Sequence, residues 1–188
     1  MSQKITPTQI KIIMGLGNPT DEYEHTYHNI GKLLLAHIST HTPENWTISD
    51  TQSPKKSFSY RKLQDTHGHT YICVEPLLFM NESGKALHEA LSFFKAPLSS
   101  ALIIHDDSDQ MIGSYKISYN QRSAGHKGIE SIIQQCGSQE FHRCKIGIRP
   151  VQEIVRKKAN EFVLKRISKK DMSIFEKEVF PKITSSLF

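Results

Sequence analysis

Three polar side chains that could bind a substrate or move a proton lie close together near the start of the chain. Asn18 ends the run GLGN, and His28 and Asn29 follow ten residues later, directly before a helical pattern. The carboxyl ends of strands and the amino ends of helices converge at one edge of an α/β sheet, where ligands bind. We therefore expect a catalytic site at this edge.

Two further segments carry the partners that an acid–base histidine needs. Asp106 directly follows the apolar run ALIIH, and a carboxylate there can fix the tautomer of an imidazole and increase its basicity. Asn81 precedes a second helical pattern, and its amide N–H can stabilise a developing oxyanion, a type of donor whose loss costs ~3 kcal/mol. Together with His28, these residue types indicate attack by a histidine-activated water.

Each residue also has a plain structural interpretation. Asp106 could belong to a solvated acidic loop, Asn81 to a turn, and His28 to a helix start without a function. A dinucleotide site at GLGNPT, residues 15–20, lacks the third glycine and the acidic residue that it needs. His25 and His28 form H-x-x-H without HExxH or a third ligand at recognisable spacing. We expect neither a metal nor a cofactor.

The bulk composition is typical of a soluble globular protein. The chain has 188 residues, 37% of them hydrophobic and 23% charged, and no apolar run approaches the ~18 residues of a membrane span. The first residues carry no apolar export signal. Three cysteines without C-x-x-C spacing suggest neither a disulfide framework nor a zinc site. We expect one domain over residues 1–188, located in the cytoplasm.

The net charge of +5 is concentrated in the last quarter of the chain. Residues 1–142 contain 12 Lys and Arg against 14 Asp and Glu, a balance of −2, whereas residues 143–188 contain 12 against 5, a balance of +7. A polyanionic partner would explain this excess. A solvated helical tail with lysines on its wet face explains it too, and charge alone favours that second explanation.

Strands that alternate with helices predict a single α/β domain, with a twisted, mixed and mostly parallel sheet and helices on both faces. Apolar runs and alternating patterns predict strands at 10–16, 58–64, 70–74, 101–105, 115–119 and 143–148, the second and third forming a hairpin. Helical spacing predicts helices after His28, from Ser83 to before Pro97, after His126 and over 171–186. A loop is expected over 39–56, and Pro76 should end the third strand.

Taken together, these segments closely resemble the bacterial peptidyl-tRNA hydrolases. The matching residues follow the family's order and spacing through most of the chain. They are GLGNP at 15–19, Tyr23, Thr26 with His28 and Asn29, FMN-x-SG at 79–84, HD at 105–106, GH at 125–126, FHR at 141–143, IGI at 146–148 and FVL at 162–164. The resemblance implies a monomeric α/β enzyme without a cofactor, which hydrolyses the ester joining a peptide to the terminal ribose of tRNA.

The resemblance also implies catalytic roles for four residues. His28 would be the general base that activates water, and Asp106 would orient and polarise it. Asn81 would bind the substrate and support the oxyanion. Asn18 would contact the peptide backbone and help to distinguish peptidyl-tRNA from free aminoacyl-tRNA.

Substrate contacts outside the catalytic group are implied as well. Tyr23 and Phe79 would line the site near the acceptor end of the tRNA. His126, Lys127 and Arg143 would contact the substrate, and the basic final quarter of the chain would face tRNA phosphates in a salt-sensitive manner.

Three residues depart from the family pattern. Thr20 replaces the glycine usual after GLGNP, Tyr27 replaces the arginine before the histidine, and Lys127 replaces the asparagine after His126. A lysine donates hydrogen bonds but cannot accept one. Lys127 therefore either reaches a tRNA phosphate or weakens the positioning of the substrate.

The alternative from another functional class is a non-catalytic RNA-binding relative that kept the fold, as in plant organelle splicing factors. A binding module has no need of a base–carboxylate pair. The joint presence of His28, Asp106, Asn18 and Asn81 therefore favours the enzyme.

Overall fold

The structure, a computed structural model, describes residues 10–53, 55–150 and 162–188. Within these ranges seven strands form one sheet. They are β1 (Ile12–Gly15), β2 (Thr47–Ile48), β3 (Phe58–Gln64), β4 (Thr70–Pro76), β5 (Ala101–Met111), β6 (Tyr115–Tyr119) and β7 (His142–Arg149). The expected domain also includes residues 1–9, 54 and 151–161, which lie outside the described residues.

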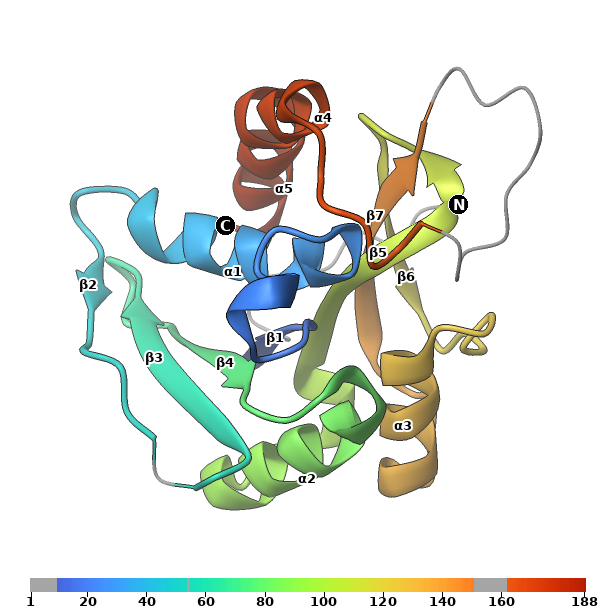
Figure 1. Cartoon of the computed structure of the whole chain (residues 1–188). Helices are drawn as coiled ribbons and strands as arrows, with labels where there is room; N and C mark the ends of the chain where they lie inside the picture. Colours follow the sequence, from blue (N-terminus) through green and yellow to red (C-terminus); the bar gives the residue numbers. More distant parts are fainter. Residues whose placement is uncertain (1–9, 54, 151–161) are drawn as a thin grey trace.

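The strands follow the order β2-β3-β4-β1-β5-β7-β6 (Figure 1). The four central strands β4, β1, β5 and β7 run parallel, and β3, β2 and β6 extend the sheet with antiparallel pairs. Parallel neighbours need crossover connections, which helices supply. The mixed sheet with a parallel centre is therefore confirmed, as is the β3–β4 hairpin.

Helices cover both faces of the sheet (Figure 1). The helices are α1 (Ile30–Thr40), α2 (Ser83–Phe94), α3 (Lys127–Cys136), α4 (Lys169–Ile174) and α5 (Phe180–Leu187). One hydrophobic cluster lies between the sheet and α1, α4 and α5, and a second lies between the sheet and α2 and α3. In the described ranges, none of the helices combines the length and the apolar character needed to cross a membrane.

The central strand β1 packs against a hydrophobic cluster on each face of the sheet. Its side chains alternate between the two clusters, with Ile13 on the α1 face and Ile12 and Met14 on the α2 face. All three are at most 1% exposed. Burial of such a side chain contributes roughly 1.5–3 kcal/mol, so the strand that leads into the Asn18 loop is firmly anchored.

Strand β5 is longer than its sequence pattern predicts. The expected strand ended at His105, whereas β5 continues to Met111 because Asp106 and Asp107 pair with Ile146 and Gly147 of β7. Pairing with a neighbouring strand thus overrides the loop character of the run DDSD. Asp106 is consequently held on a rigid strand and not on a loop.

Three smaller boundaries also differ from expectation. Pro76 ends β4 as expected, but it is itself the last residue of the strand and pairs with Phe58, so β4 runs past the expected range 70–74. The short strand β2 lies within the expected loop 39–56 because it pairs with β3. The C-terminal helix begins at Lys169, and a π-helical turn, Phe175–Val179, separates α4 from α5.

Candidate active site

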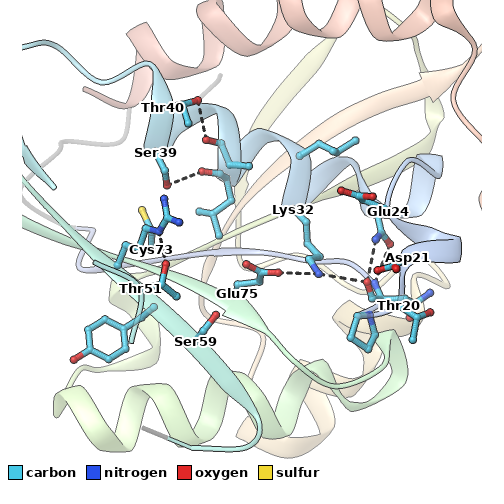
Figure 2. Close-up of a pocket in the computed structure, with 18 residues that line it drawn as sticks. Thr20, Asp21, Glu24, Lys32, Ser39, Thr40, Thr51, Ser59, Cys73 and Glu75 are labelled. Carbon is cyan, nitrogen blue, oxygen red and sulfur yellow. Dashed lines mark hydrogen bonds and ion pairs between the residues drawn. The ribbon is translucent and has the colours of Figure 1, made fainter. Parts of the chain in front are cut away.

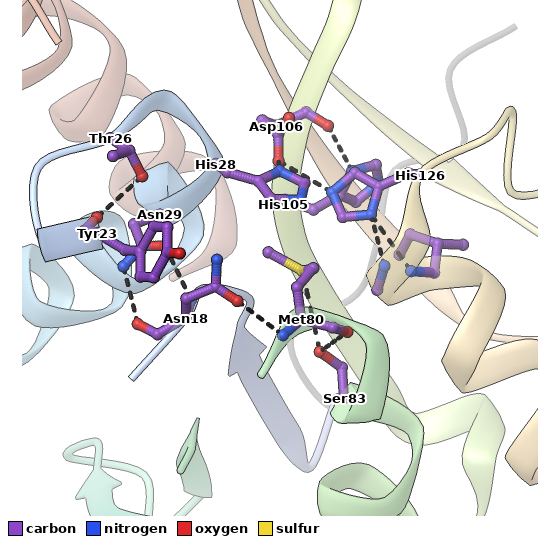
Figure 3. A network of polar contacts seen from close by, with 12 residues as sticks. Asn18, Tyr23, Thr26, His28, Asn29, Met80, Ser83, His105, Asp106 and His126 are labelled. Carbon is purple, nitrogen blue, oxygen red and sulfur yellow. Dashed lines mark hydrogen bonds and ion pairs between the residues drawn. The ribbon is translucent and has the colours of Figure 1, made fainter. Parts of the chain in front are cut away.

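The loop after β1 holds Asn18 through both its backbone and its side chain. Asn29 Oδ1 accepts a hydrogen bond from the Asn18 N–H at 2.8 Å, and Asn29 Nδ2 donates to the Asn18 carbonyl at 3.0 Å. Asn18 Oδ1 accepts from the backbone N–H of Met80 at 2.8 Å. Because that N–H can only donate, the amide oxygen must face it. Asn18 Nδ2 therefore points away from Met80, on the His28 side of the network (Figure 3).

His28 lies in a 3-10 turn, Tyr27–Asn29, directly before α1. Its Nδ1 is 2.8 Å from Oδ1 of Asp106 on β5 (Figure 3). An ionised carboxylate only accepts hydrogen bonds, so Nδ1 of the neutral ring carries the proton and Nε2 keeps a lone pair. The His28 side chain is 12% exposed and that of Asp106 is 3% exposed. The pair thus presents a base backed by a buried carboxylate.

His126 is a second imidazole on the same carboxylate oxygen. Its Nε2 lies 2.9 Å from Asp106 Oδ1. Its Nδ1 accepts from the backbone N–H groups of Gly128 and Ile129 at 3.1 and 3.3 Å, so the ring caps α3. Two donors at Nδ1 require a lone pair there, and the proton of the neutral ring must then be on Nε2. Both nitrogens of His126 are therefore engaged.

The same hydrogen bonds bear on metal binding at this cluster. His28, Asp106 and His126 bring three potential ligand atoms within 4.8 Å of one another. A metal would need the lone pair on Nε2 of His126. The cap of α3 already needs the lone pair on Nδ1, and a neutral imidazole has only one. The arrangement fits a hydrogen-bonded acid–base cluster better than a metal site.

The charge state of Asp106 follows from its surroundings. Burial by itself would raise the pKa of this carboxyl group. The positive potential and the N–H donors of His126 and His28 outweigh that effect and hold the pKa well below its usual range. Asp106 is therefore ionised at neutral pH and accepts both hydrogen bonds.

His105 supports the cluster from behind. It is 3% exposed, and its ring contacts that of His126 edge-on, with centroids 4.6 Å apart. Its Nδ1 lies 2.6 Å from the carbonyl oxygen of Asp106, which requires Nδ1 to donate. Burial, followed by the influence of His126, lowers the pKa of His105 well below its usual range, so this ring stays neutral.

Aromatic and amide side chains form the rim next to Asn18. The rings of Tyr23 and Phe79 meet edge-to-face with centroids 6.5 Å apart, and Phe79 is 46% exposed. Asn81 lies in the 3-10 turn Met80–Glu82, one residue after the N–H that holds Asn18, and is exposed. All three residues therefore border the network while remaining open to a ligand.

The two cations expected to contact tRNA are placed very differently. Lys127 begins α3, and its side chain is 72% exposed and pairs with Glu130 at 3.0 Å. Arg143 is only 1% exposed, and its Nη2 donates to the carbonyl of Arg122 at 3.1 Å. Burial also lowers the pKa of Arg143. A guanidinium covered by protein is not presented to a phosphate.

The chain matches known proteins over most of its length. The model of the family "Peptidyl-tRNA hydrolase" matches residues 12–187. The chain belongs to the peptidyl-tRNA hydrolase family. The peptidyl-tRNA hydrolase of Lactobacillus helveticus is 40% identical over 140 residues, which cover 74% of this chain and 72% of the relative. That of Thermosynechococcus vestitus is 35% identical over 167 residues, 87% of this chain and 79% of the relative.

A solved structure of the family agrees with the fold. The crystal structure of the peptidyl-tRNA hydrolase from Acinetobacter baumannii matches with a TM-score of 0.81 and 25% sequence identity. The match covers 95% of this chain and 87% of that chain. The fold class and the family that the motifs predicted are therefore confirmed.

Several parts of this peptidyl-tRNA hydrolase site were not assigned from the sequence. The sequence marks Asn29 as a polar group beside His28 but does not reveal its hydrogen bonds to the Asn18 backbone, and it marks His105 only as part of the motif HD. It reveals neither the cap that His126 makes on α3 nor the role of the Met80 N–H. The available signal for Asn29 was its position at a helix start. For His105 it was a polar residue at the end of a buried run. The Met80 contact spans 62 residues and has no local signal.

A cavity of about 420 Å³ lies beside this peptidyl-tRNA hydrolase site, between α1 and strands β3 and β4 (Figure 2). It shares Asn18 and Asn29 with the network but not His28 or Asp106. Lys32 crosses it, with Nζ 2.9 Å from Glu75 Oε1 and 3.4 Å from the Asn18 carbonyl. This lysine therefore helps to fix the Asn18 loop.

Proposed function

We propose that this chain hydrolyses the ester bond between peptide and tRNA in peptidyl-tRNA, releasing free peptide and free tRNA. The observation that carries the proposal is the hydrogen bond of 2.8 Å between His28 and Asp106 beside the Asn18 amide, in a member of the peptidyl-tRNA hydrolase family. Ester hydrolysis needs a base for water and donors for the oxyanion. The test is cleavage of peptidyl-tRNA by the wild-type chain and by His28→Ala.

In the proposed mechanism His28 is the general base. Its Nε2 takes a proton from water while the water oxygen bonds to the ester carbonyl carbon, which gives a tetrahedral oxyanion. Asp106 keeps the Nδ1–H hydrogen bond and stabilises the imidazolium. When the intermediate collapses, the bond to the ribose oxygen breaks and the imidazolium returns its proton to that oxygen. The products are the tRNA hydroxyl and the peptide carboxylate, which loses its own proton to solvent.

The amide side chains and the rim bind substrate in this proposal. Asn81 binds the substrate and supports the oxyanion, and Asn18 donates its Nδ2–H to the peptide backbone. Tyr23 and Phe79 offer ring faces near the acceptor end, where a base can stack. His126 acts through Asp106 by holding the carboxylate in place.

Replacement of Asn18 by aspartate tests the role of its amide. Asn18→Asp keeps an oxygen for the Met80 N–H but replaces the Nδ2 donor by an acceptor. Because a donor to the substrate is lost, we expect kcat/KM for peptidyl-tRNA to fall about 10- to 100-fold. Steady-state cleavage kinetics measure the effect. Asn45→Asp, an exposed asparagine far along the chain, is the matched control and should behave as wild type. An unchanged kcat/KM in Asn18→Asp would show that the Asn18 amide does not bind the substrate.

The proposed partner is tRNA, bound through exposed cations and not through Arg143. Lys165 and Arg166 are two of these cations, and they lie on a segment paired with residues 25–28. Thr26 and Arg166 form a β-bridge, and the Tyr27 N–H donates to the Lys165 carbonyl at 3.2 Å. Among the described residues, exposed cations at the start of α3 and over residues 165–170 are Lys127, Lys165, Arg166, Lys169 and Lys170. Binding through phosphates should weaken steeply as salt rises. We propose a monomer, acting in the cytoplasm where translation occurs.

Lys127 is a departure from the family pattern that directly follows His126 and begins α3. Its ammonium is paired with Glu130 on the surface of α3, and surface pairs of this kind contribute little. We therefore expect Lys127→Asn to leave turnover at saturating substrate intact or to raise it, as measured by multiple-turnover cleavage, although the variant loses one of the cations proposed to bind tRNA. A collapse of activity would show that the lysine has acquired a function of its own.

A further inference from the structure

A segment near the C-terminus lies along the backbone that carries His28. We call residues 162–171 the strap. Its hydrogen bonds to residues 25–28 are of the antiparallel β type, and Thr26 and Arg166 form an isolated bridge within them. The backbone bonds are His28 N–H to the Val163 carbonyl at 2.8 Å, Tyr27 N–H to the Lys165 carbonyl at 3.2 Å, and Ile167 N–H to the His25 carbonyl at 2.8 Å.

A side-chain contact joins the same two segments. The Tyr27 hydroxyl donates to Asp171 Oδ2 at 2.6 Å. Tyr27 is 7% exposed, and its ring packs edge-on against Phe162 at the other end of the strap, with centroids 6.4 Å apart. Burial, and then the hydrogen bond to Asp171, raise the pKa of Tyr27 to about 12, so the hydroxyl remains a donor at every pH at which the enzyme would work.

Asp171 also connects this contact to the start of α4. The Ser168 side chain caps the helix by accepting from the Asp171 N–H at 3.1 Å, and its own hydroxyl donates to Asp171 Oδ2 at 2.7 Å. The Tyr27 hydroxyl and the helix cap therefore share one carboxylate oxygen. Displacement of α4 from the His28 turn must break the Tyr27–Asp171 hydrogen bond.

The strap matters for the base because His28 is fixed from two directions. Asp106 holds the ring through Nδ1, and Val163 holds the backbone through the His28 N–H. A base must be placed to within about 0.5 Å for efficient proton transfer, so a loosened backbone would move Nε2 away from the attacking water.

We propose that the Tyr27–Asp171 hydrogen bond locks the strap over the His28 turn and so positions the base against Asp106. Tyr27 is then a positioning residue that acts through His28, at a site where the family pattern has arginine. This inference rests on the proposed function, because it assigns Tyr27 a part in the placement of the base.

Removal of the tyrosine hydroxyl is the first test. Tyr27→Phe keeps the ring on Phe162 and loses only the donor to Asp171. We expect kcat for peptidyl-tRNA cleavage to fall about fivefold while KM stays within twofold, because the chemical step and not tRNA binding depends on the base. Amide hydrogen exchange at the His28 N–H should become faster, since the strap opens more often.

Three further variants separate positioning from general stability. Tyr115→Phe removes a half-buried tyrosine hydroxyl outside the strap and should keep wild-type kcat. Ser168→Ala removes the α4 cap and the second donor to Asp171 Oδ2, so it should lower the melting temperature and should lower kcat less than Tyr27→Phe does. Tyr27→Arg supplies a different donor to the same carboxylate and should restore kcat to within twofold of wild type.

A double-mutant cycle completes the test. Asp171→Ala should lower kcat as much as Tyr27→Phe, and the double variant should lose no more than either single variant. The proposal is overturned by a wild-type kcat in Tyr27→Phe, by additive losses, or by a change confined to KM. If Tyr27→Phe does not fold, Asp171→Ala tests the proposal instead, with the same expected changes in kcat, KM and amide hydrogen exchange at His28. Full activity of His28→Ala would instead refute the proposed function itself. Results with the strap variants cannot refute that function, so the two failures can be distinguished.

Discussion

The variant His28→Ala should cleave peptidyl-tRNA with a kcat on the order of 10³-fold below wild type. A positioned general base contributes typically 10²–10⁴ to a rate, and here the imidazole is the base that the buried Asp106 carboxylate supports. The affinity for the substrate should stay within a few-fold, because truncation leaves Asn18, Tyr23 and Phe79 in place. Single-turnover cleavage measured beside filter binding of the same tRNA separates the two quantities.

A second histidine–aspartate pair supplies a matched control. His69 Nδ1 lies 3.0 Å from Asp65 Oδ2 on the β3–β4 hairpin, away from the network around Asp106. His69→Ala removes a pair with the same chemistry and should cleave at the wild-type rate. Equal rates in His28→Ala and wild type would reject catalysis by His28. Retained tRNA binding in that case would support the alternative of a non-catalytic RNA-binding relative.

The second large effect is expected for Asp106→Asn. The amide is neutral and offers one acceptor oxygen in place of a carboxylate, so the imidazolium formed during attack loses its counter-charge. His28 relies on this group for its tautomer, and His126 donates its Nε2–H to the same oxygen. We expect kcat to fall on the order of 10²- to 10³-fold, as measured in the same single-turnover assay. Asp109→Asn, an exposed neighbour on β5, is the control and should remain active.

Asp106 also makes stability depend on pH. Its pKa in the folded state is held below its unfolded value of ~3.9 by His126 and His28 against the effect of burial. The stabilisation is therefore fully present above the unfolded pKa and is lost as pH falls through about 4 toward the folded pKa. At pH 7 the wild type should be more stable than Asp106→Asn, and the difference should narrow below pH 4 in urea unfolding followed by circular dichroism. A difference that stays constant from pH 7 to pH 3 would contradict this assignment.

The elements that position the site could largely be predicted because their signals are local. The buried run before Gly15 predicts β1, and helical spacing after His28 predicts α1, with both boundaries close to those observed. Since carboxyl ends of parallel strands meet at one edge, Asn18 and Asp106 could be expected near one another. Their convergence with His28 followed from this topology and from the family motifs.

Contacts between distant segments could not be predicted in the same way. The orientation of the Asn18 amide depends on the N–H of Met80, and the tautomer of His126 depends on the geometry of a helix cap. By its residue type Arg143 is an available cation, but its side chain is buried and donates to the Arg122 carbonyl. The polar run at Asp106 has the composition of a loop, but it pairs with β7 as part of β5. In each case tertiary structure, and not local propensity, determines the outcome.

The protonation of the two rings around Asp106 tests the central claim most directly. Nitrogen-15 NMR of histidine-labelled protein, recorded where the imidazoles are neutral, reports which nitrogen of each ring carries the proton. We predict a proton on Nδ1 of His28 and on Nε2 of His126, with both signals displaced in Asp106→Asn. A His28 ring protonated on Nε2 would leave no lone pair facing the substrate water and would contradict the proposed mechanism.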